Sequence, residues 1–289
     1  MLEKCKLTGF ADEIAADLED QINLLLQLKQ SYIEFRSANK KGVADYTIEE
    51  AIQVKNRLDQ EGIKVSAIDS PIGKISITDD FEPHFKRYQH VVELAKIFET
   101  KYIRMFSFFI PEGENPENYK EEVFNRIRRF VNYAKEEDVI LLHENEKDIY
   151  GDTEDRCYEL MQEFYGEHFK LTFDFANFVQ CGVNTVSAYE LLKPYIEYIH
   201  IKDAILETGE VVPPGKGDGH LWEILWDLHE NGYEGFLSLE PHLSNFSGLQ
   251  NLEKNAMERK MTDTEAAYTL AYQGLQEILS QDGPGPLLR

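Results

Sequence analysis

Basic residues are scarce in this chain of 289 residues, in which 30 lysines and arginines stand against 53 aspartates and glutamates. The formal net charge at pH 7 is therefore −23. A protein with so much negative charge stays in solution and repels polyanions. Nucleic acid and anionic membranes are consequently poor candidate partners, and a phosphorylated ligand would need a local cluster of Lys or Arg.

Cysteine and long apolar runs are scarce as well. The three cysteines, Cys5, Cys157 and Cys181, are too few and too scattered for a disulfide framework, and they form no CxxC pair. The first ten residues, MLEKCKLTGF, lack the apolar core of a signal peptide, and no apolar run reaches 18 residues. We therefore expect a reduced, cytoplasmic protein. Its oligomeric state stays open, with a homo-oligomer among the alternatives.

Short apolar runs alternate with amphipathic stretches along the whole chain. The runs predict eight β-strands, at 6–11, 32–37, 64–70, 102–109, 139–145, 170–176, 198–204 and 236–242. The stretches predict helices at about 16–29, 82–99, 117–136, 154–164, 186–193 and 264–280, and two more that end before Gly62 and Gly232. Thr47 and Glu50, at the start of one of these, have the spacing of a capping box.

Eight strand–helix units in one chain favour an α/β fold with a parallel sheet, and most simply a single (β/α)8 TIM barrel over residues 1–280. A doubly wound open sheet is the alternative, but no GxGxxG motif follows the first predicted strand. Residues 281–289, DGPGPLLR with the preceding Gln, read as a disordered tail.

Polar residues gather where the last four predicted strands end. Leu142, Thr172 and Ser238 set the phase of three of these strands, and the residue two positions further along shares the same face. Near the top of a barrel this face points inward, so four side chains should converge: Glu144, Asp174, His200 and Glu240.

Three carboxylates in a barrel mouth repel one another, and a divalent cation relieves that repulsion. Three oxygens and one imidazole suit Mn²⁺, Mg²⁺, Co²⁺ or Zn²⁺, and we take Mn²⁺ as the first choice. Each residue alone has an ordinary structural explanation, since a lone strand histidine is usually a hydrogen-bonded core residue. Four in matching phase on consecutive strands favour one metal site, and no second cluster of carboxylates and histidine is evident in the sequence.

The order Glu, Asp, His, Glu on strands five to eight resembles the xylose isomerase-like barrel superfamily. The likeness covers essentially the whole chain, and its most telling segments are HENEKDIYGDT, FDFAN, HIKD and PPGKGDG. The superfamily includes tagatose 3-epimerase-like sugar epimerases, inosose dehydratases, hydroxypyruvate isomerases and endonuclease IV-like nucleases. The resemblance implies a divalent metal that holds a small keto sugar, with Glu144 and Glu240 moving a proton on opposite faces of one carbon through an enediolate.

Two positions depart from the tagatose 3-epimerase pattern, since Asn177 and Leu206 stand where those enzymes commonly have His and Arg. Lys202 lies in phase with His200 and is a candidate substrate-binding residue, or else a salt-bridge partner of a nearby carboxylate. Asn177, Arg36 and His242 are the other candidates for substrate contacts. The segment GKGDG at 215–219 weakly resembles a phosphate-cradling loop.

These patterns predict a metal-dependent isomerase or epimerase of a small sugar or sugar derivative, phosphorylated or not. A dehydratase that uses the same site is the nearest alternative, because an enediolate can expel a β-hydroxyl group. A sugar- or metal-binding barrel without catalysis is an alternative of another class. A nuclease is disfavoured by the net charge and by strands two to four, which end without histidine.

Overall fold

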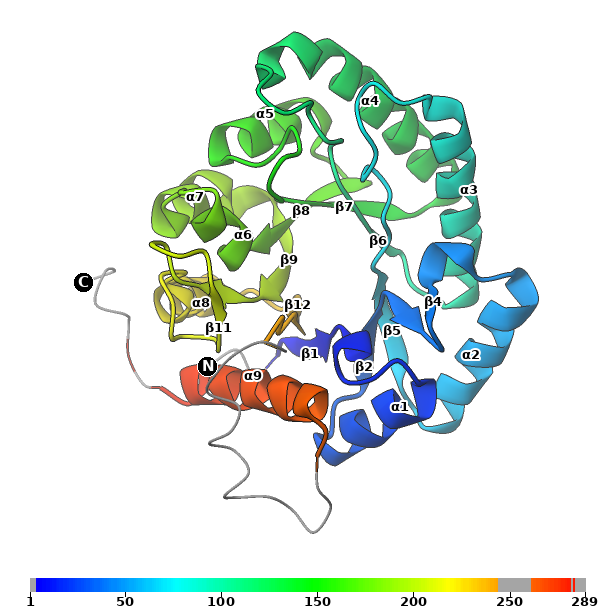
Figure 1. Cartoon of the computed structure of the whole chain (residues 1–289), viewed down its shortest axis with the longest axis vertical. Helices are drawn as coiled ribbons and strands as arrows, with labels where there is room; N and C mark the ends of the chain where they lie inside the picture. Colours follow the sequence, from blue (N-terminus) through cyan, green and yellow to red (C-terminus); the bar gives the residue numbers. More distant parts are fainter. Residues whose placement is uncertain (1–3, 244–260, 282, 284–289) are drawn as a thin grey trace.

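The computed structural model describes residues 4–243, 261–281 and 283, and its strands form a (β/α)8 barrel (Figure 1). The barrel strands are β1 (Lys6–Gly9), β2 (Tyr32–Phe35), β5 (Lys64–Ile68), β6 (Tyr102–Met105), β7 (Ile140–Glu144), β8 (Phe169–Asp174), β9 (Ile196–Ile201) and β12 (Phe236–Leu239). All neighbouring strands pair in parallel, in the order β1-β12-β9-β8-β7-β6-β5-β2. A parallel bridge between Phe10 and Glu34 brings β1 against β2 and closes the ring. The barrel prediction is confirmed, and the open sheet is wrong.

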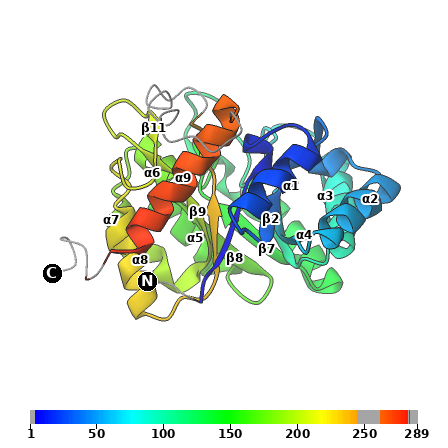
Figure 2. The ribbon, with the colours of Figure 1, turned by 90° about the horizontal axis from the view of Figure 1, so that it is seen from below.

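Helices surround the strands on the outside (Figure 1). They are α1 (Leu18–Gln27), α2 (Ile48–Gln60), α3 (Phe81–Ile97), α4 (Lys120–Glu137), α5 (Glu154–Phe164), α6 (Phe175–Gln180), α7 (Thr185–Leu192), α8 (Leu221–Glu230) and α9 (Asp263–Leu279). Short 3₁₀ helices in the described residues supplement them: η1 (Ala11–Glu13), η2 (Val43–Asp45), η3 (Pro116–Tyr119) and η4 (Lys193–Tyr195). In Figure 2, α9 lies along the side of the barrel, where it packs beside α8 and β12. No helix in the described ranges is long and apolar enough to cross a membrane.

Local chemistry accounts for the helix boundaries. Thr47 and Glu50 form the expected capping box at the start of α2, in which each side chain accepts from the other residue's backbone N–H. The predicted strand at 170–176 is too long, because β8 ends at Asp174, whose side chain caps the short helix α6. Two small hairpins were also not predicted: β3 (Ser37–Ala38) with β4 (Lys41–Gly42), and β10 (Asp203–Ala204) with β11 (Val211–Val212). Most of the predicted tail lies outside the described residues.

Two of the apolar clusters involve the barrel strands. The larger lies between the strands and the helices and contains most of the buried aliphatic and aromatic side chains. A smaller cluster of Ala67, Leu142 and Tyr198 fills the inside of the barrel. Leu142 pairs in register with Arg104, and Tyr198 with Thr172. These pairs fix which residues face inward, and they confirm the phase expected for β7, β8 and β9.

Candidate functional site

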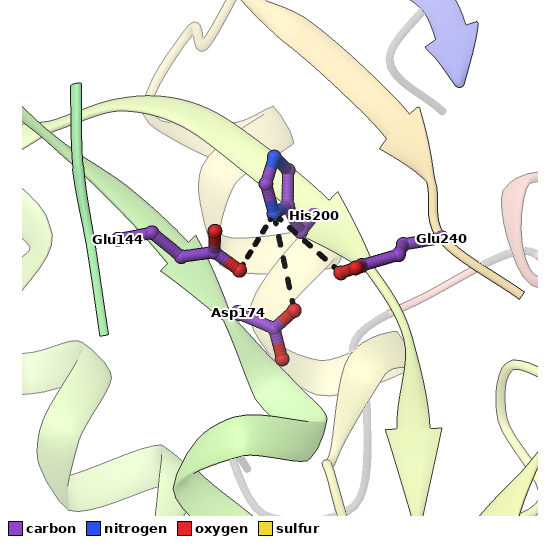
Figure 3. Close-up of side chains that lie close together, drawn as sticks. All are labelled: Glu144, Asp174, His200 and Glu240. Atoms are coloured by element: carbon purple, nitrogen blue, oxygen red, sulfur yellow. Dashed lines mark hydrogen bonds and ion pairs between the residues drawn. The ribbon is translucent and has the colours of Figure 1, made fainter. Parts of the chain in front are cut away.

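Four inward-facing side chains meet at the carboxyl ends of β7, β8, β9 and β12, as the sequence predicted (Figure 3). Glu144, Asp174, His200 and Glu240 each offer one ligand atom, and all four atoms lie within 4.8 Å of one another. All four residues are buried. Parallel pairing explains the convergence, because Asp174 lies in register with His200 and Glu240 follows two residues after Ser238, the other neighbour of His200.

One ring nitrogen of His200 faces all three carboxylates (Figure 3). Its Nδ1 lies 3.0 Å from Glu144 Oε1, 3.8 Å from Glu240 Oε2 and 3.9 Å from Asp174 Oδ2. The other nitrogen, Nε2, lies 3.3 Å from Glu34 Oε1 on β2, and Ser238 donates to the second Glu34 oxygen. A carboxylate behind an imidazole fixes the orientation of the ring.

Asp174 has one oxygen committed to the fold and one directed into the cluster. Its Oδ1 accepts from the backbone N–H of Asn177 at 2.8 Å, which is the cap of α6. Its Oδ2 accepts no regular hydrogen bond from the part of the chain that the structure describes, although Lys202 Nζ lies 3.0 Å away. A buried carboxylate oxygen without a hydrogen bond is costly unless a cation binds it. This oxygen and the oxygen-rich donor set fit a divalent metal ion.

Lys202 extends from the end of β9 into the same cluster. Its ammonium lies 2.8 Å from Glu240 Oε2 and 3.0 Å from Asp174 Oδ2. Despite burial, these two carboxylates hold the pKa of Lys202 well above its usual range. The lysine is therefore charged and compensates two of the three carboxylates.

Arginines hold the outer oxygens of the two glutamates. Arg104 Nη1 lies 3.0 Å from Glu144 Oε2, and Arg36 Nη1 lies 3.5 Å from Glu240 Oε1. The amide of Asn177 donates to Glu144 Oε1 at 3.2 Å and to the carbonyl of Asn145 at 2.9 Å. Arg36 and Asn177 thus contact the carboxylates themselves, and their polar groups already have partners in the protein.

His242 is the most open of the candidate residues, with 44% of its side chain exposed. Its Nε2 lies 3.1 Å from Glu13 Oε1 and 3.4 Å from Glu240 Oε1. Its backbone has a φ of 46°, a left-handed conformation that is uncommon for residues other than glycine. Glu13, Glu240 and His242 form a second carboxylate-and-histidine group, which the sequence did not reveal. Arg36 also contacts both glutamates, so a positive charge is already present there.

Burial and neighbouring charges shift the protonation of the cluster. Burial alone raises the pKa of Glu144, but the charges of His200 and Arg104 outweigh it and hold that pKa at about 2. Burial raises the pKa of Asp174 to about 7 in spite of the attraction of Lys202. Burial lowers the pKa of His200, but the charges of Glu144 and Glu34 outweigh it and hold the pKa well above its usual range. A cation that enters this site must therefore displace protons from Asp174 and His200.

The glycine-rich segment at 215–219, which follows β11, does not cradle a phosphate. The backbone N–H groups of Gly215, Gly217 and Gly219 all donate to the carboxylate of Asp203, each at 2.9 Å. A Cβ on Gly217 would lie 2.5 Å from the carbonyl oxygen of Ala204, so only glycine fits there. The weak phosphate-loop interpretation is wrong, because an internal carboxylate already occupies the donors.

Three acidic residues of the site were missed as functional residues in the sequence. Glu34 stands behind His200, and Asp69 follows β5 and lies between the two arginines. Glu13, in η1, contacts Arg36 and His242. A signal existed for Asp69, because it is the penultimate residue of the strand predicted at 64–70, as Glu144 is of the strand predicted at 139–145.

Comparison with known proteins identifies the family. Residues 23–262 match the family described as xylose isomerase-like TIM barrel, and the chain belongs to that family. A curated relative, the 3-dehydroshikimate dehydratase of Bacillus anthracis, is 26% identical over 129 residues. This match covers 45% of the present chain and 46% of the relative, so it spans about half the length of each protein.

Solved structures of low sequence identity share the fold. A probable 3-DHS dehydratase of Bacillus anthracis, AsbF, has a TM-score of 0.73 at 18% identity and covers 96% of this chain and 100% of its own. The IOLI protein with a bound zinc atom has a TM-score of 0.72 at 17% identity, with coverages of 95% and 98%. An L-ribulose 3-epimerase has a TM-score of 0.67 at 17% identity, with coverages of 95% and 94%.

Proposed function

We propose that this member of the xylose isomerase-like TIM barrel family is a divalent-metal-dependent isomerase or epimerase of a small keto sugar or sugar derivative. The observation that carries the proposal is the buried convergence of Glu144, Asp174, His200 and Glu240, with one glutamate on each side of the other two ligands. Relatives in this family act on small sugars or on a related keto acid, which supports an enzyme of that kind.

The four converging residues would hold the metal, with Mn²⁺ as the first choice and Mg²⁺, Co²⁺ or Zn²⁺ as alternatives. A bound divalent cation polarises the carbonyl of a keto substrate and lowers the pKa of the adjacent C–H group. Two observations support this assignment. Asp174 Oδ2 accepts no regular hydrogen bond from the described residues, and His200 Nδ1 faces all three carboxylates. Glu34 would keep the His200 ring oriented through its other nitrogen.

Glu144 and Glu240 would exchange the proton with the substrate carbon. Both are ionised at neutral pH, as proton acceptors must be: charged neighbours lower the pKa of each despite burial, chiefly His200 at Glu144 and Lys202 at Glu240. They leave strands that are separated by β8 and β9, so they reach a central substrate from different sides. One glutamate would remove a proton on one face, and the other would take up a proton from solvent and deliver it to the opposite face, which inverts a stereocentre.

The remaining polar residues would divide into two groups. Lys202 and His242 would donate to substrate hydroxyl groups, since the lysine is charged at the cluster and the histidine is exposed at its edge. Arg36 and Asn177, first considered for substrate contacts, would instead hold Glu240 and Glu144 in place. We further propose a cytoplasmic setting, which is supported by three free thiols at Cys5, Cys157 and Cys181.

A dehydratase is the second candidate, because the curated relative with 26% identity carries that activity. In that reaction a glutamate removes the proton from the carbon next to the carbonyl. The bond between the β-carbon and its oxygen then breaks, and its electron pair leaves with the hydroxyl group. The leaving hydroxyl takes a proton and departs as water. Lys202, whose ammonium lies beside Glu240, is the donor within reach.

Turnover of a panel of ketoses in D₂O distinguishes the candidates. With the Mn²⁺-loaded protein and D-tagatose, D-fructose and L-ribulose, an epimerase gives a product that carries deuterium on the reacting carbon and has otherwise unchanged composition. Products lighter by one water would favour the dehydratase. Product without deuterium would contradict the assignment of the two glutamates, and no conversion of any substrate would favour a binding protein without catalysis.

A further inference from the structure

Three buried or half-buried groups, alternately basic and acidic, connect the two glutamates, in the order Glu144, Arg104, Asp69, Arg36, Glu240. Arg104 contacts Glu144 Oε2 at 3.0 Å through Nη1 and pairs with Asp69 through Nε. Arg36 lies 3.5 Å from Glu240 Oε1 through Nη1 and 3.8 Å from Asp69 Oδ2 through Nε. Asp69 is therefore the one carboxylate in the described part of the site that contacts both arginines.

Asp69 is held rigidly and has few other partners. It directly follows β5, its backbone N–H donates to the carbonyl of Phe35 at 3.0 Å, and its side chain is fully buried. Neither of its oxygens accepts a regular hydrogen bond from the residues that the structure describes. A buried ion pair is weak evidence for a stabilising role, because desolvation offsets the attraction. The position of Asp69 instead fixes where the two guanidinium groups lie.

One aromatic ring lies against both arginines. Phe10 is fully buried, with the Arg36 guanidinium 4.7 Å and the Arg104 guanidinium 5.7 Å from the ring centre. The same ring packs edge-on against His200, with ring centres 5.1 Å apart. Both guanidinium groups thus contact the same buried carboxylate and the same buried ring.

We propose that Asp69 is a positioning residue. By binding the two arginines that contact Glu144 and Glu240, it holds these proton-transfer glutamates in place relative to each other. The inference rests on the proposed function, because it assigns Asp69 a part in a reaction with two proton acceptors. Asp69 does not touch the substrate, and it acts only through Arg36 and Arg104.

The two arginines depend on Asp69 to different degrees. Without it, Arg36 keeps Asp12 at 2.8 Å and Glu13 at 3.2 Å in addition to Glu240. Arg104 keeps only Glu144 and a long contact of 3.5 Å to the carbonyl of Ser70 among the polar groups described. An Asp69→Asn substitution should therefore displace Arg104, and with it Glu144, more than the Glu240 side.

Displacement of one glutamate changes which face of the substrate carbon receives the proton. In each turnover the C–H bond breaks, its electron pair moves toward the carbonyl, and the proton passes to one glutamate. Inversion requires the other glutamate to take up a proton from solvent and give it to the opposite face. If one glutamate is displaced, the first exchanges its proton with solvent and returns a proton to the face it came from. Substrate then acquires solvent hydrogen without inversion.

The experiment uses the Mn²⁺-loaded full chain in D₂O with whichever ketose of the panel the parent protein converts. We expect Asp69→Asn to raise the ratio of deuterium in recovered substrate to deuterium in product at least about threefold. We also expect kcat to fall by about 10-fold or more, since a displacement of about 1 Å can lower the rate up to about 10²-fold. Metal content and the unfolding temperature are measured on the same samples. The matched control is Asp227→Asn, because Asp227 accepts from Tyr189 on the outer helices and lies away from the site.

Each outcome decides between the claims. An unchanged deuterium ratio in a folded, metal-loaded Asp69→Asn protein overturns the role of Asp69, whereas a parent protein that places no deuterium in product overturns the proposed function itself. If Asp69→Asn loses its metal or fails to fold, Arg104→Lys replaces it, because a single ammonium cannot hold Asp69 and Glu144 as a guanidinium does. An unchanged ratio in Arg104→Lys then overturns the inference, and a raised ratio supports it.

Discussion

Two neighbouring layers inside the barrel have opposite chemistry, although the same strands build both. The lower layer is neutral and contains Thr8, Ala67, Leu142, Thr172, Tyr198 and Ser238. Two residues further along those strands, the side chains are Phe10, Asp69, Glu144, Asp174, His200 and Glu240. The hydroxyl groups of Thr8 and Tyr198 each contact Ser66 at 2.8 Å, and Ser238 donates to Glu34. Thr172 Oγ1 has no hydrogen-bond partner among the described residues.

The difference separates the side chains that stabilise the barrel from those that we expect to bind metal and substrate. The lower layer has no charged side chain, so no cation is needed to balance charge there. The charged layer leaves a carboxylate oxygen of Asp174 without a hydrogen bond and raises the pKa of that residue to about 7. Changes in the upper layer should therefore alter metal binding and turnover, and changes in the lower layer should alter stability alone.

The largest expected effect comes from the two glutamates of the upper layer. Glu144→Gln or Glu240→Gln should lower kcat at least about 10²-fold, because an amide cannot accept the substrate proton. Steady-state kinetics with the best ketose of the panel measures this. Glu159→Gln is the control, since Glu159 lies on α5 and accepts from Tyr150 at 2.6 Å. A loss of kcat as large in Glu159→Gln as in the site variants would contradict the special role of the two glutamates.

Removal of the metal should destabilise the protein in a pH-dependent manner. At a concentration 100 times its Kd, a bound ion adds about 2.7 kcal/mol to the free energy of unfolding. The raised pKa of Asp174 stabilises the metal-free protein below its ordinary pKa, and this stability is lost as the pH rises through about 7. The raised pKa of His200 has the same sign.

Between pH 6 and pH 8 the metal-free protein should thus lose about 1 kcal/mol through Asp174 alone. The increment from the metal should grow over the same range, because the ion competes with fewer protons. Denaturant unfolding with Mn²⁺ and with chelator at both pH values checks this. A metal increment that shrinks toward pH 8 would contradict the assignment of Asp174.

The smallest expected effect lies in the lower layer. Thr8→Val keeps the shape of the side chain and removes the hydrogen bond to Ser66, whose hydroxyl still donates to the carbonyl of Ile33 at 3.1 Å. The free energy of unfolding should fall by about 1 kcal/mol, while kcat and metal content stay at the parent level. A large loss of metal in this variant would show that the two layers are not independent.

The sequence predicted the residues whose position depends on strand parity alone. Alternation placed Glu144, Asp174 and Glu240 on the inward face, and the parallel order of the strands brought them to one end of the barrel. Parity also placed Lys202 beside His200, where the structure has it.

The contacts that the sequence did not predict depend on register and on loops. The bulge between Ile33 and Glu34 shifts β2 against β5, and Glu34 reaches His200 from the far side of the barrel. Glu13 comes from η1, a 3₁₀ helix outside the strand pattern. The hydrogen bonds from three glycine N–H groups to Asp203 could be seen only in the folded loop. The sequence alone suggests that these groups bind an external anion.

Metal content of the parent protein and of His200→Ala tests the central claim most directly. The claim is that the charged layer is completed by one divalent cation held by His200 and three carboxylates. Elemental analysis after purification with Mn²⁺ and exhaustive dialysis should find close to one equivalent in the parent and far less in the variant, with both proteins folded by circular dichroism. Equal metal content in the two proteins, or none in either, would contradict it.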